Sequence, residues 1–337
     1  MKSVDLTPKA EDRMKYMTLG KTGVAVSRLC FGTMSFGQEA DEATAALMLR
    51  RCREAGVNFF DCANVYSRGR AEEILGRLIR DCRHELIITS KVGIAMGDGP
   101  NDRGLSRRHI LQQVEASLRR LGTDWLDVYF CHHEDPQVPV EETMRAMDDL
   151  VRQGKVRYVG VSNWPAWRIG RTLGDAERLG LAPIRVIQPM YNLAKRTAEI
   201  EILPMARAEG LGVITYSPLG GGLLTGKYIG QKPAGSRLVV NKRYTDRYAE
   251  RTYHDAAERF CAYAAKAGIS PVTLAVAWVK AHPAITAPII GARNLEQLEP
   301  SLAAGEYEMT AEQWREISAL TPPIPVATDR DEERAPK

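Results

Sequence analysis

Residues 58–92 read NFFDCANVYSRGRAEEILGRLIRDCRHELIITSKV, and this stretch contains the unit from which the rest of the chain is built. It opens on a short apolar run at residues 58–63, continues through an amphipathic segment at 71–82 and closes on a second apolar run at 86–92. Runs that are apolar on consecutive positions are typical of strands buried on both faces. Strand, helix and strand in this order predict a parallel pair joined by a right-handed crossover.

The same unit recurs about eight times along the chain. This number of units predicts a (β/α)8 barrel rather than an open doubly wound sheet. The α/β fold class predicted is therefore a TIM barrel. The expected strands cover residues 29–34, 58–63, 86–92, 126–132, 156–162, 186–191, 212–219 and 285–291. The clearest helical patterns between them cover residues 42–55, 71–82, 107–121 and 141–152, and the third has Ser106 as its expected N-cap and Gly122 as its stop.

Three further segments lie outside the repeat. Residues 16–19 and 24–28 flank Gly20-Lys21-Thr22-Gly23 and predict an N-terminal β-hairpin that closes one end of the barrel. A long loop after strand 7, residues 227–251, is a predicted lid. Helical patterns at 256–266, 272–281, 295–303 and 311–319 lead into a C-terminal helical extension. We expect one barrel domain over 16–321, a polar N-terminal segment over 1–15 and a Pro-rich, charged tail over 322–337.

The composition limits the classes of partner and the cellular locations that we expect for the protein. The 337 residues include 46 Lys+Arg and 42 Asp+Glu, a formal net charge of +4 that is too small to indicate nucleic-acid binding. Six scattered cysteines form neither a disulfide framework nor a zinc motif, which favours a reducing cytoplasm. The polar N-terminus and the lack of a long apolar run predict neither secretion nor a membrane span.

Ionisable residues follow three consecutive predicted strands. Asp61 ends the second strand, Lys91 the third and His132 the fourth, and Tyr66 lies in the loop after Asp61. The carboxyl ends of barrel strands form the active face, and neighbouring strands lie about 4.8 Å apart. We therefore expect these four side chains to share one site.

The four residue types suit proton donation to an oxygen that gains negative charge. A neighbouring ammonium such as Lys91 stabilises a tyrosine phenolate, Asp61 would orient that ammonium, and His132 could hydrogen-bond a carbonyl oxygen. Such chemistry requires a source of hydride. His132-His133-Glu134-Asp135 could suggest a metal site, but adjacent strand residues point to opposite sides, so we predict no metal. Cys62 and Cys131 are expected to be buried structural thiols.

Seven stretches give the chain a resemblance to the aldo-keto reductase family, from the hairpin to Leu320. They read GVNFFDCANVYSRGRAEEILG, LIITSKVG, LGTDWLDVYFCHHEDP, VRYVGVSNW, IQPMYNL, VITYSPLGGGLLTGKY and PIIGARNLEQL. The resemblance implies a catalytic tetrad of Asp61, Tyr66, Lys91 and His132, with Tyr66 as general acid. It also implies a bound NADP(H) whose nicotinamide contacts Ser162, Asn163 and Gln188 and stacks on Tyr216. The pyrophosphate would lie along Ser217, Leu219, Gly220, Gly222 and Leu223, and the adenosine phosphate end along Gly291, Arg293 and Gln297.

The resemblance also explains why the chain lacks a G-x-G-x-x-G motif, since barrel reductases bind the dinucleotide without one. The sequence departs from the family pattern at Glu299-Pro300-Ser301, where the family usually has an acidic residue and Asn. Arg293 is suited to a 2′-phosphate, which favours NADPH over NADH.

The predicted function is reduction of a small aldehyde or ketone, or the reverse oxidation of an alcohol. The alternative is a cofactor-sensing subunit resembling potassium-channel beta subunits. Two points stay open: whether Trp164 packs or walls the pocket, and whether Arg237, Lys242, Arg243 and Arg247 of the lid contact the cofactor.

Overall fold

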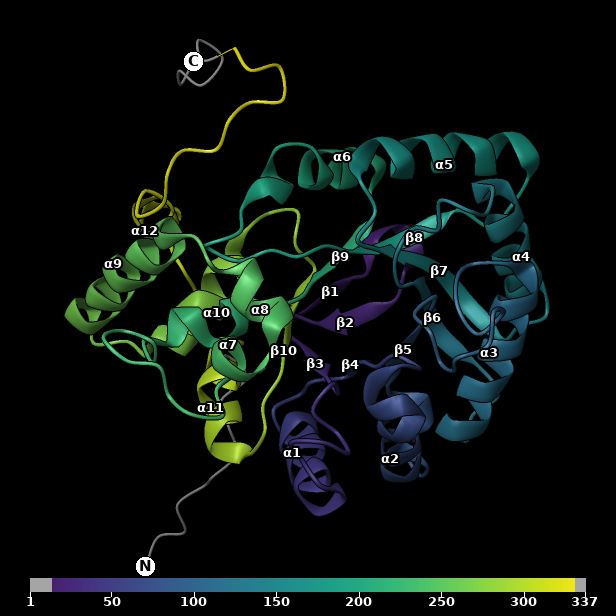
Figure 1. Ribbon diagram of the computed structural model, residues 1–337, viewed down its shortest axis with the longest axis horizontal. Helices are drawn as coiled ribbons and strands as arrows, with labels where there is room; N and C mark the ends of the chain where they lie inside the picture. Colours follow the sequence, from purple (N-terminus) through teal and green to yellow (C-terminus); the bar gives the residue numbers. More distant parts are fainter. Residues whose placement is uncertain (1–13, 331–337) are drawn as a thin grey trace, which may run out of the picture.

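The structure is a computed structural model that describes residues 14–330, shown in Figure 1. Residues 1–13 and 331–337, which hold most of the predicted N-terminal segment and part of the predicted tail, lie outside the described residues. The domain boundaries at 16 and 321 therefore stay a prediction.

A closed barrel of eight parallel strands confirms the predicted fold, with the strands in the order β10-β3-β4-β5-β6-β7-β8-β9. Every expected strand is present, although several are shorter than the apolar run that predicted them. The strands are β3 (Cys30–Gly32), β4 (Phe59–Asp61), β5 (Ile87–Val92), β6 (Leu126–Cys131), β7 (Val156–Ser162), β8 (Ile184–Gln188), β9 (Gly212–Thr215) and β10 (Ala287–Ile290).

Helices cover the outside of the barrel (Figure 1). The predicted third helix begins and ends as expected, with the Ser106 side chain accepting from the His109 amide and Gly122 left-handed at φ 61°. The covering helices are α1 (Glu42–Glu54), α2 (Arg70–Ile79), α3 (Arg107–Leu121), α4 (Val140–Arg152), α5 (Ala166–Leu179), α6 (Ile202–Glu209), α9 (Arg251–Ala267), α10 (Pro271–Ala281), α11 (Leu295–Ala303) and α12 (Ala311–Ser318).

Alternation along each strand divides the apolar residues into two cores. Phe59, Val128 and Phe130 belong to a cluster inside the barrel, whereas Phe60 and Tyr129 pack outward against the helices. Because side chains alternate, the residues two positions beyond Phe59 and Phe130 also face inward, at the carboxyl end of the barrel. This places the ends of β4 and β6 around one opening.

The N-terminal hairpin closes the opposite end of the barrel. Its strands, β1 (Tyr16–Thr18) and β2 (Ala25–Ser27), pair antiparallel around the short helix η2 (Gly20–Thr22). Leu19 and Val26 are fully buried in the inner cluster, and the Ser27 amide donates to Asn58 Oδ1 at the start of β4. The predicted plug is therefore present.

The long segment after β9 contains more helix than predicted. It forms the short helices α7 (Arg237–Val240) and α8 (Lys242–Arg247), and α9 begins at Arg251 rather than at residue 256. The Thr245 hydroxyl donates to Leu238 O and ties α8 to α7. Within residues 14–330 no single helix is long and apolar enough to cross a membrane, and α9 with α10 satisfies length and composition only as a pair bent by 104°.

Candidate active site

Three of the four predicted catalytic side chains meet through one ammonium group. Lys91 Nζ lies 2.6 Å from Asp61 Oδ2 and 3.2 Å from the Tyr66 hydroxyl, and it donates a third hydrogen bond to Cys62 O at 2.8 Å. The His132 ring lies edge-on to the Tyr66 ring at 6.3 Å between centroids. The structure therefore brings all four residues together at the carboxyl end of the barrel.

A tight turn after β4 positions the tyrosine. Tyr66 begins the helical turn η3 (Tyr66–Gly69), in which Ser67 and Arg68 have φ angles of 49° and 55°. Left-handed backbone is costly for residues with a side chain and persists where surrounding contacts enforce it. The Ser67 hydroxyl supplies one such contact by donating to Phe36 O at 2.5 Å.

Two donors that the sequence analysis did not assign to the tetrad hold Asp61. Its Oδ1 accepts from Thr89 Oγ1 at 2.7 Å and from Gln188 Nε2 at 2.8 Å, leaving Oδ2 for Lys91. Thr89 lies two residues before Lys91 on β5, so strand alternation could have placed it on the same inward face. Gln188 was predicted to contact nicotinamide, and here its amide nitrogen is bound to the tetrad.

Burial outweighs the ammonium in setting the state of the tyrosine. The surrounding protein desolvates the hydroxyl and raises the pKa of Tyr66 to about 12, although Lys91 opposes that shift. Burial also lowers the pKa of Lys91, but Asp61 and Tyr66 reverse this and hold it above its ordinary value. Lys91 is thus a permanent cation and Tyr66 a protonated donor. The expected effect of Lys91 is present, since its charge lowers the pKa of Tyr66, but burial raises that pKa by more.

His132 is neutral. Burial, followed by the positive charge of Lys91, lowers its pKa to about 2. The expected reason for excluding a shared metal was wrong: β6 ends at Cys131, the chain bends, and the His132 and His133 rings stack in parallel at 5.2 Å. Within residues 14–330 no group of three His, Cys, Asp or Glu residues has the arrangement of a metal site.

Residues predicted to face the nicotinamide form a hydrogen-bonded chain beside the tetrad. The Ser162 hydroxyl donates to Gln188 O at 2.8 Å, and Asn163 Nδ2 donates to His132 O at 2.9 Å. The Tyr216 hydroxyl donates to Asn163 Oδ1 at 2.6 Å and so fixes its ring. Asn163 has a φ of 60°, which this network maintains.

A glycine-rich turn follows Tyr216 and contains the residues predicted to contact the pyrophosphate. In η6 (Gly220–Thr225), three successive glycines have φ angles of 59°, 66° and 94°. A Cβ at Gly222 would lie 2.7 Å from Lys227 Nζ, so the turn brings backbone and a cation close together. Successive turn amides beside a cation are suited to anionic oxygens. The predicted residues here are Ser217, Leu219, Gly220, Gly222 and Leu223.

The predicted adenosine end lies after β10, and a carboxylate already occupies it. Glu39 Oε1 lies 3.6 Å from Arg293 Nη2 and 3.3 Å from Arg237 Nη2. Gln297, in the first turn of α11, accepts from the Arg293 amide at 3.3 Å. Gly291 directly follows β10, and a Cβ there would lie 3.7 Å from Gly32 O. Glu299, in the divergent stretch, is bound in a two-pronged ion pair by Arg51.

The remaining candidates are all buried. Trp164 is 4% exposed, with Arg168 over its ring at 5.4 Å, and its indole Nε1 has no hydrogen-bond partner among the described residues, so whether it forms a wall of the pocket stays a prediction. Cys62 and Cys131 are buried, and burial raises the pKa of each thiol to about 12, so neither is a reactive thiolate.

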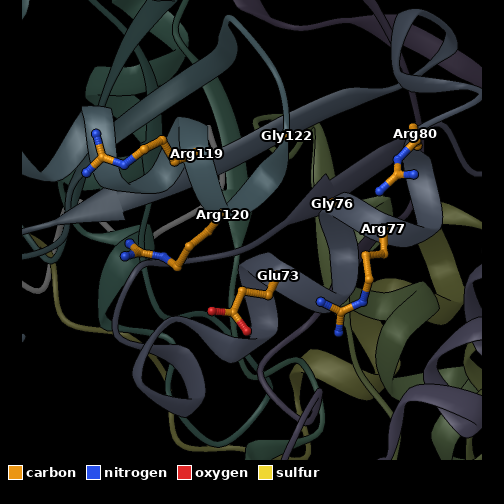
Figure 2. A pocket seen from close by; sticks show the side chains of 7 residues that line it. All are labelled: Glu73, Gly76, Arg77, Arg80, Arg119, Arg120 and Gly122. Carbon is orange, nitrogen blue, oxygen red and sulfur yellow. The ribbon is translucent and has the colours of Figure 1, made fainter.

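A surface hollow of about 320 Å³ lies away from the tetrad, between α2 and α3. Figure 2 shows that its arginines diverge, with Arg119 and Arg120 extending to one side and Arg77 and Arg80 lying on the other. Arg77 and Arg120 are bound to Glu42 and Glu72. This hollow therefore has no convergent set of free donors.

The eight-stranded barrel thus holds a buried Asp–Lys–Tyr group and a neutral histidine at its carboxyl end, an arrangement suited to proton donation. The chain belongs to the Aldo/keto reductase family, whose model matches residues 28–322. The family generally uses NAD(P)H and acts on small carbonyl compounds.

Relatives of two descriptions are similar over most of the chain. A probable voltage-gated potassium channel subunit beta of Arabidopsis thaliana is 41% identical over 86% of this chain and 91% of its own length, and one of Oryza sativa matches equally. An uncharacterized oxidoreductase of Bacillus subtilis, YrpG, is 38% identical over 92% of this chain and 96% of its own length.

Proposed function

We propose that the protein is an NADPH-dependent carbonyl reductase that converts an aldehyde or ketone to an alcohol, with Tyr66 as the proton donor. The observation that supports this most strongly is the Lys91 ammonium, which binds both Asp61 Oδ2 and the Tyr66 hydroxyl. When bound, the reduced nicotinamide supplies a hydride to the carbonyl carbon. The protein's own part is to orient the carbonyl oxygen and to give it a proton.

Each residue of the group has a defined task. Neutral His132 donates a hydrogen bond to the carbonyl oxygen and holds it beside Tyr66. Tyr66 transfers its proton to that oxygen as negative charge develops, and Lys91 stabilises the resulting phenolate. Asp61, fixed by Thr89 and Gln188, keeps Lys91 aimed at the tyrosine.

The cofactor assignment rests on the shape and charge of the barrel mouth. Ser162, Asn163 and Tyr216 hold the nicotinamide end in this proposal, and the η6 turn with Lys227 holds the pyrophosphate. Arg293 would bind the 2′-phosphate of NADPH after exchanging Glu39 for it. Arg293→Leu is then expected to lower the NADPH-over-NADH preference in kcat/KM about 10–100-fold, the value of one charge-assisted contact.

Tyr66→Phe tests the proton donor. Loss of general acid catalysis predicts a fall in kcat of about 10²–10⁴-fold, with NADPH affinity, measured by fluorescence, retained. Tyr263→Phe, which removes a surface hydroxyl bound to Glu316, is the matched control and keeps full activity. Undiminished turnover in Tyr66→Phe would overturn the assignment.

The channel-subunit relatives support one alternative, a subunit that binds the cofactor without significant turnover. The tetrad is compatible with both. Tight NADPH binding by purified protein, with negligible consumption across aldehydes and ketones, would favour that alternative.

A further inference from the structure

A buried carboxylate on the outside of the barrel joins the two segments that carry the proton donor and its cation. Glu72, in the first turn of α2, is fully buried, and its Oε1 accepts a hydrogen bond from Ser90 Oγ at 2.5 Å. Ser90 is also fully buried and immediately precedes Lys91 on β5. We propose that Glu72 and Ser90 are positioning residues that keep the Tyr66 hydroxyl on the neighbouring ammonium, an inference that rests on the proposed reductase function.

The two segments are joined once on each face of β5. Ile88, two residues before Ser90, packs in the cluster between barrel and helices, so Ser90 points outward as well, whereas Lys91 points into the barrel. Inside, Lys91 Nζ lies 3.2 Å from the Tyr66 hydroxyl. Outside, the Ser90 hydroxyl binds Glu72, in the helix that directly follows the tyrosine turn. The stretch from Tyr66 to Glu72 is therefore bound to β5 at both of its ends.

A guanidinium from α3 completes this cluster and packs on the tyrosine turn itself. Arg120 Nε donates to Glu72 Oε2 at 2.7 Å, so both oxygens of the carboxylate have a partner. The same side chain lies against Gly69, the last residue of η3, where a Cβ would lie 2.8 Å from Arg120 Cδ and 3.0 Å from its Nε. Gly69 has a φ of 95°, which only glycine adopts without strain. The Glu72 carboxylate thus fixes the guanidinium on which the turn rests.

The tyrosine turn needs such contacts because its own backbone is strained. Ser67 and Arg68 are left-handed, and this conformation persists only where the surroundings enforce it. A carboxylate without solvent holds its neighbours firmly, since losing either donor would leave a buried charge partly unsatisfied. The rate of proton transfer falls steeply when the donor moves, by as much as about 10²-fold for a displacement of about 1 Å. Small shifts of η3 should therefore appear in kcat.

Ser90→Ala tests the positioning role, because it removes one donor and keeps the ion pair between Glu72 and Arg120. We expect kcat for carbonyl reduction to fall about 5–30-fold, with the carbonyl KM and the NADPH Kd within about twofold of wild type, since the groups that bind both ligands are unchanged. In the Tyr66→Phe background no hydroxyl remains to be positioned. The same substitution should then lower kcat less than about twofold, because residues that act as a unit give non-additive losses.

Two further variants separate positioning from loss of the fold. Ser318→Ala removes a buried hydroxyl of α12 that accepts from Trp278 Nε1 at 3.0 Å, and it should keep the wild-type kcat even where urea denaturation shows a loss of stability. Glu72→Gln keeps an oxygen for Ser90 but removes the charge that fixes the guanidinium. It should repeat the loss of kcat and the dependence of that loss on the tyrosine hydroxyl, and it decides the question if Ser90→Ala does not fold.

Three results would overturn the inference. They are an unchanged kcat in Ser90→Ala, equal losses with and without the Tyr66 hydroxyl, and a loss that falls on NADPH affinity instead. Equal losses would assign the cluster to stability alone, and lost affinity would assign it to cofactor binding. Any of these with active wild-type protein defeats this inference alone, whereas no reduction of any carbonyl by the wild type defeats the proposed function and this inference with it.

Discussion

At the scale of residues, the surroundings of the site keep the Tyr66 hydroxyl protonated. Burial holds the tyrosine protonated despite the nearby ammonium, and it holds His132 neutral. The two groups thus have the protonation states that carbonyl reduction requires, over the whole neutral range. Alcohol oxidation requires the opposite state of Tyr66, so the two directions should respond differently to pH.

We predict that kcat for reduction stays constant between about pH 5 and 9, because the pKa of Tyr66 lies above that range and the pKa of His132 below it. In the oxidation direction the phenolate accepts the proton, and its population rises tenfold per pH unit below the pKa. Alcohol oxidation should therefore accelerate steadily with pH. Steady-state rates in both directions measure this, and a reduction rate that falls through a pKa between 6 and 8 would contradict it.

The Asp61–Lys91 pair gives a second prediction at this scale. Lys91→Met leaves a buried carboxylate without its cation and should lower the free energy of unfolding by about 3–5 kcal/mol, measured by urea denaturation. Adding Asp61→Asn to that variant removes the unpaired charge while Thr89 and Gln188 still donate to Oδ1, so the double variant should be more stable than Lys91→Met alone. Additive losses would show that the two side chains are not coupled.

Which residues meet at the site was only partly predictable. Asp61 and Lys91 follow from strand order and alternation, because each lies at an inward-facing position near the carboxyl end of its strand, whereas His132 lies just beyond the end of β6. The Gln188 amide could not be assigned in this way, since a side chain at a strand end can reach several neighbours. The parallel stacking of His132 on His133 depends on where β6 ends, and strand ends are set by pairing with adjacent strands.

At the scale of elements, the hairpin depends on one close approach to the barrel. Gly20 has a φ of 54°, and a Cβ there would lie 2.8 Å from Gly210 O and still closer to the Gly212 amide of β9. Gly23, in the same turn, has a φ of 77° but no atom within 4 Å of its Cβ position. Substitutions at these two glycines therefore separate the free-energy cost of close packing from the free-energy cost of a left-handed backbone.

Gly23→Ala should lower the free energy of unfolding by about 1–2 kcal/mol, the cost of the left-handed region for a residue with a Cβ. Gly20→Ala should lose a further 1–3 kcal/mol or so through overlap with the β9 backbone. Chemical denaturation of both variants measures the difference. Equal losses would mean that the hairpin is not docked on β9 as described.

The long segment after β9 shows what sequence patterns miss at this scale. Its glycines and prolines predicted a loop, yet α7 and α8 form within it. Helices of 4 and 6 residues are too short to show helical periodicity, and tertiary contacts such as that of Tyr244 with η6 decide whether they form. The ion pairs of Glu39 with Arg237 and Arg293 could not be predicted from the sequence either, because they join residues about 200 or more positions apart.

At the scale of the whole molecule, a near-neutral chain concentrates its functional charge in a few places. The net charge of +4 predicted no polyanionic partner, and the structure places cations at the tetrad, beside the η6 turn and after β10. The barrel itself followed from the eightfold alternation of strand and helix. The alternation of strands and helices does not distinguish a reductase from a cofactor-binding subunit on the same fold, since both need the same opening at the carboxyl end of the barrel.

Turnover separates those two functions most directly. We would measure NADPH consumption by the purified wild-type protein with a panel of aldehydes and ketones, alongside NADPH affinity in the same preparation. The proposed reductase predicts sustained, carbonyl-dependent oxidation of NADPH over many turnovers. Tight NADPH binding with no carbonyl-dependent consumption would contradict it and assign the site to cofactor binding alone.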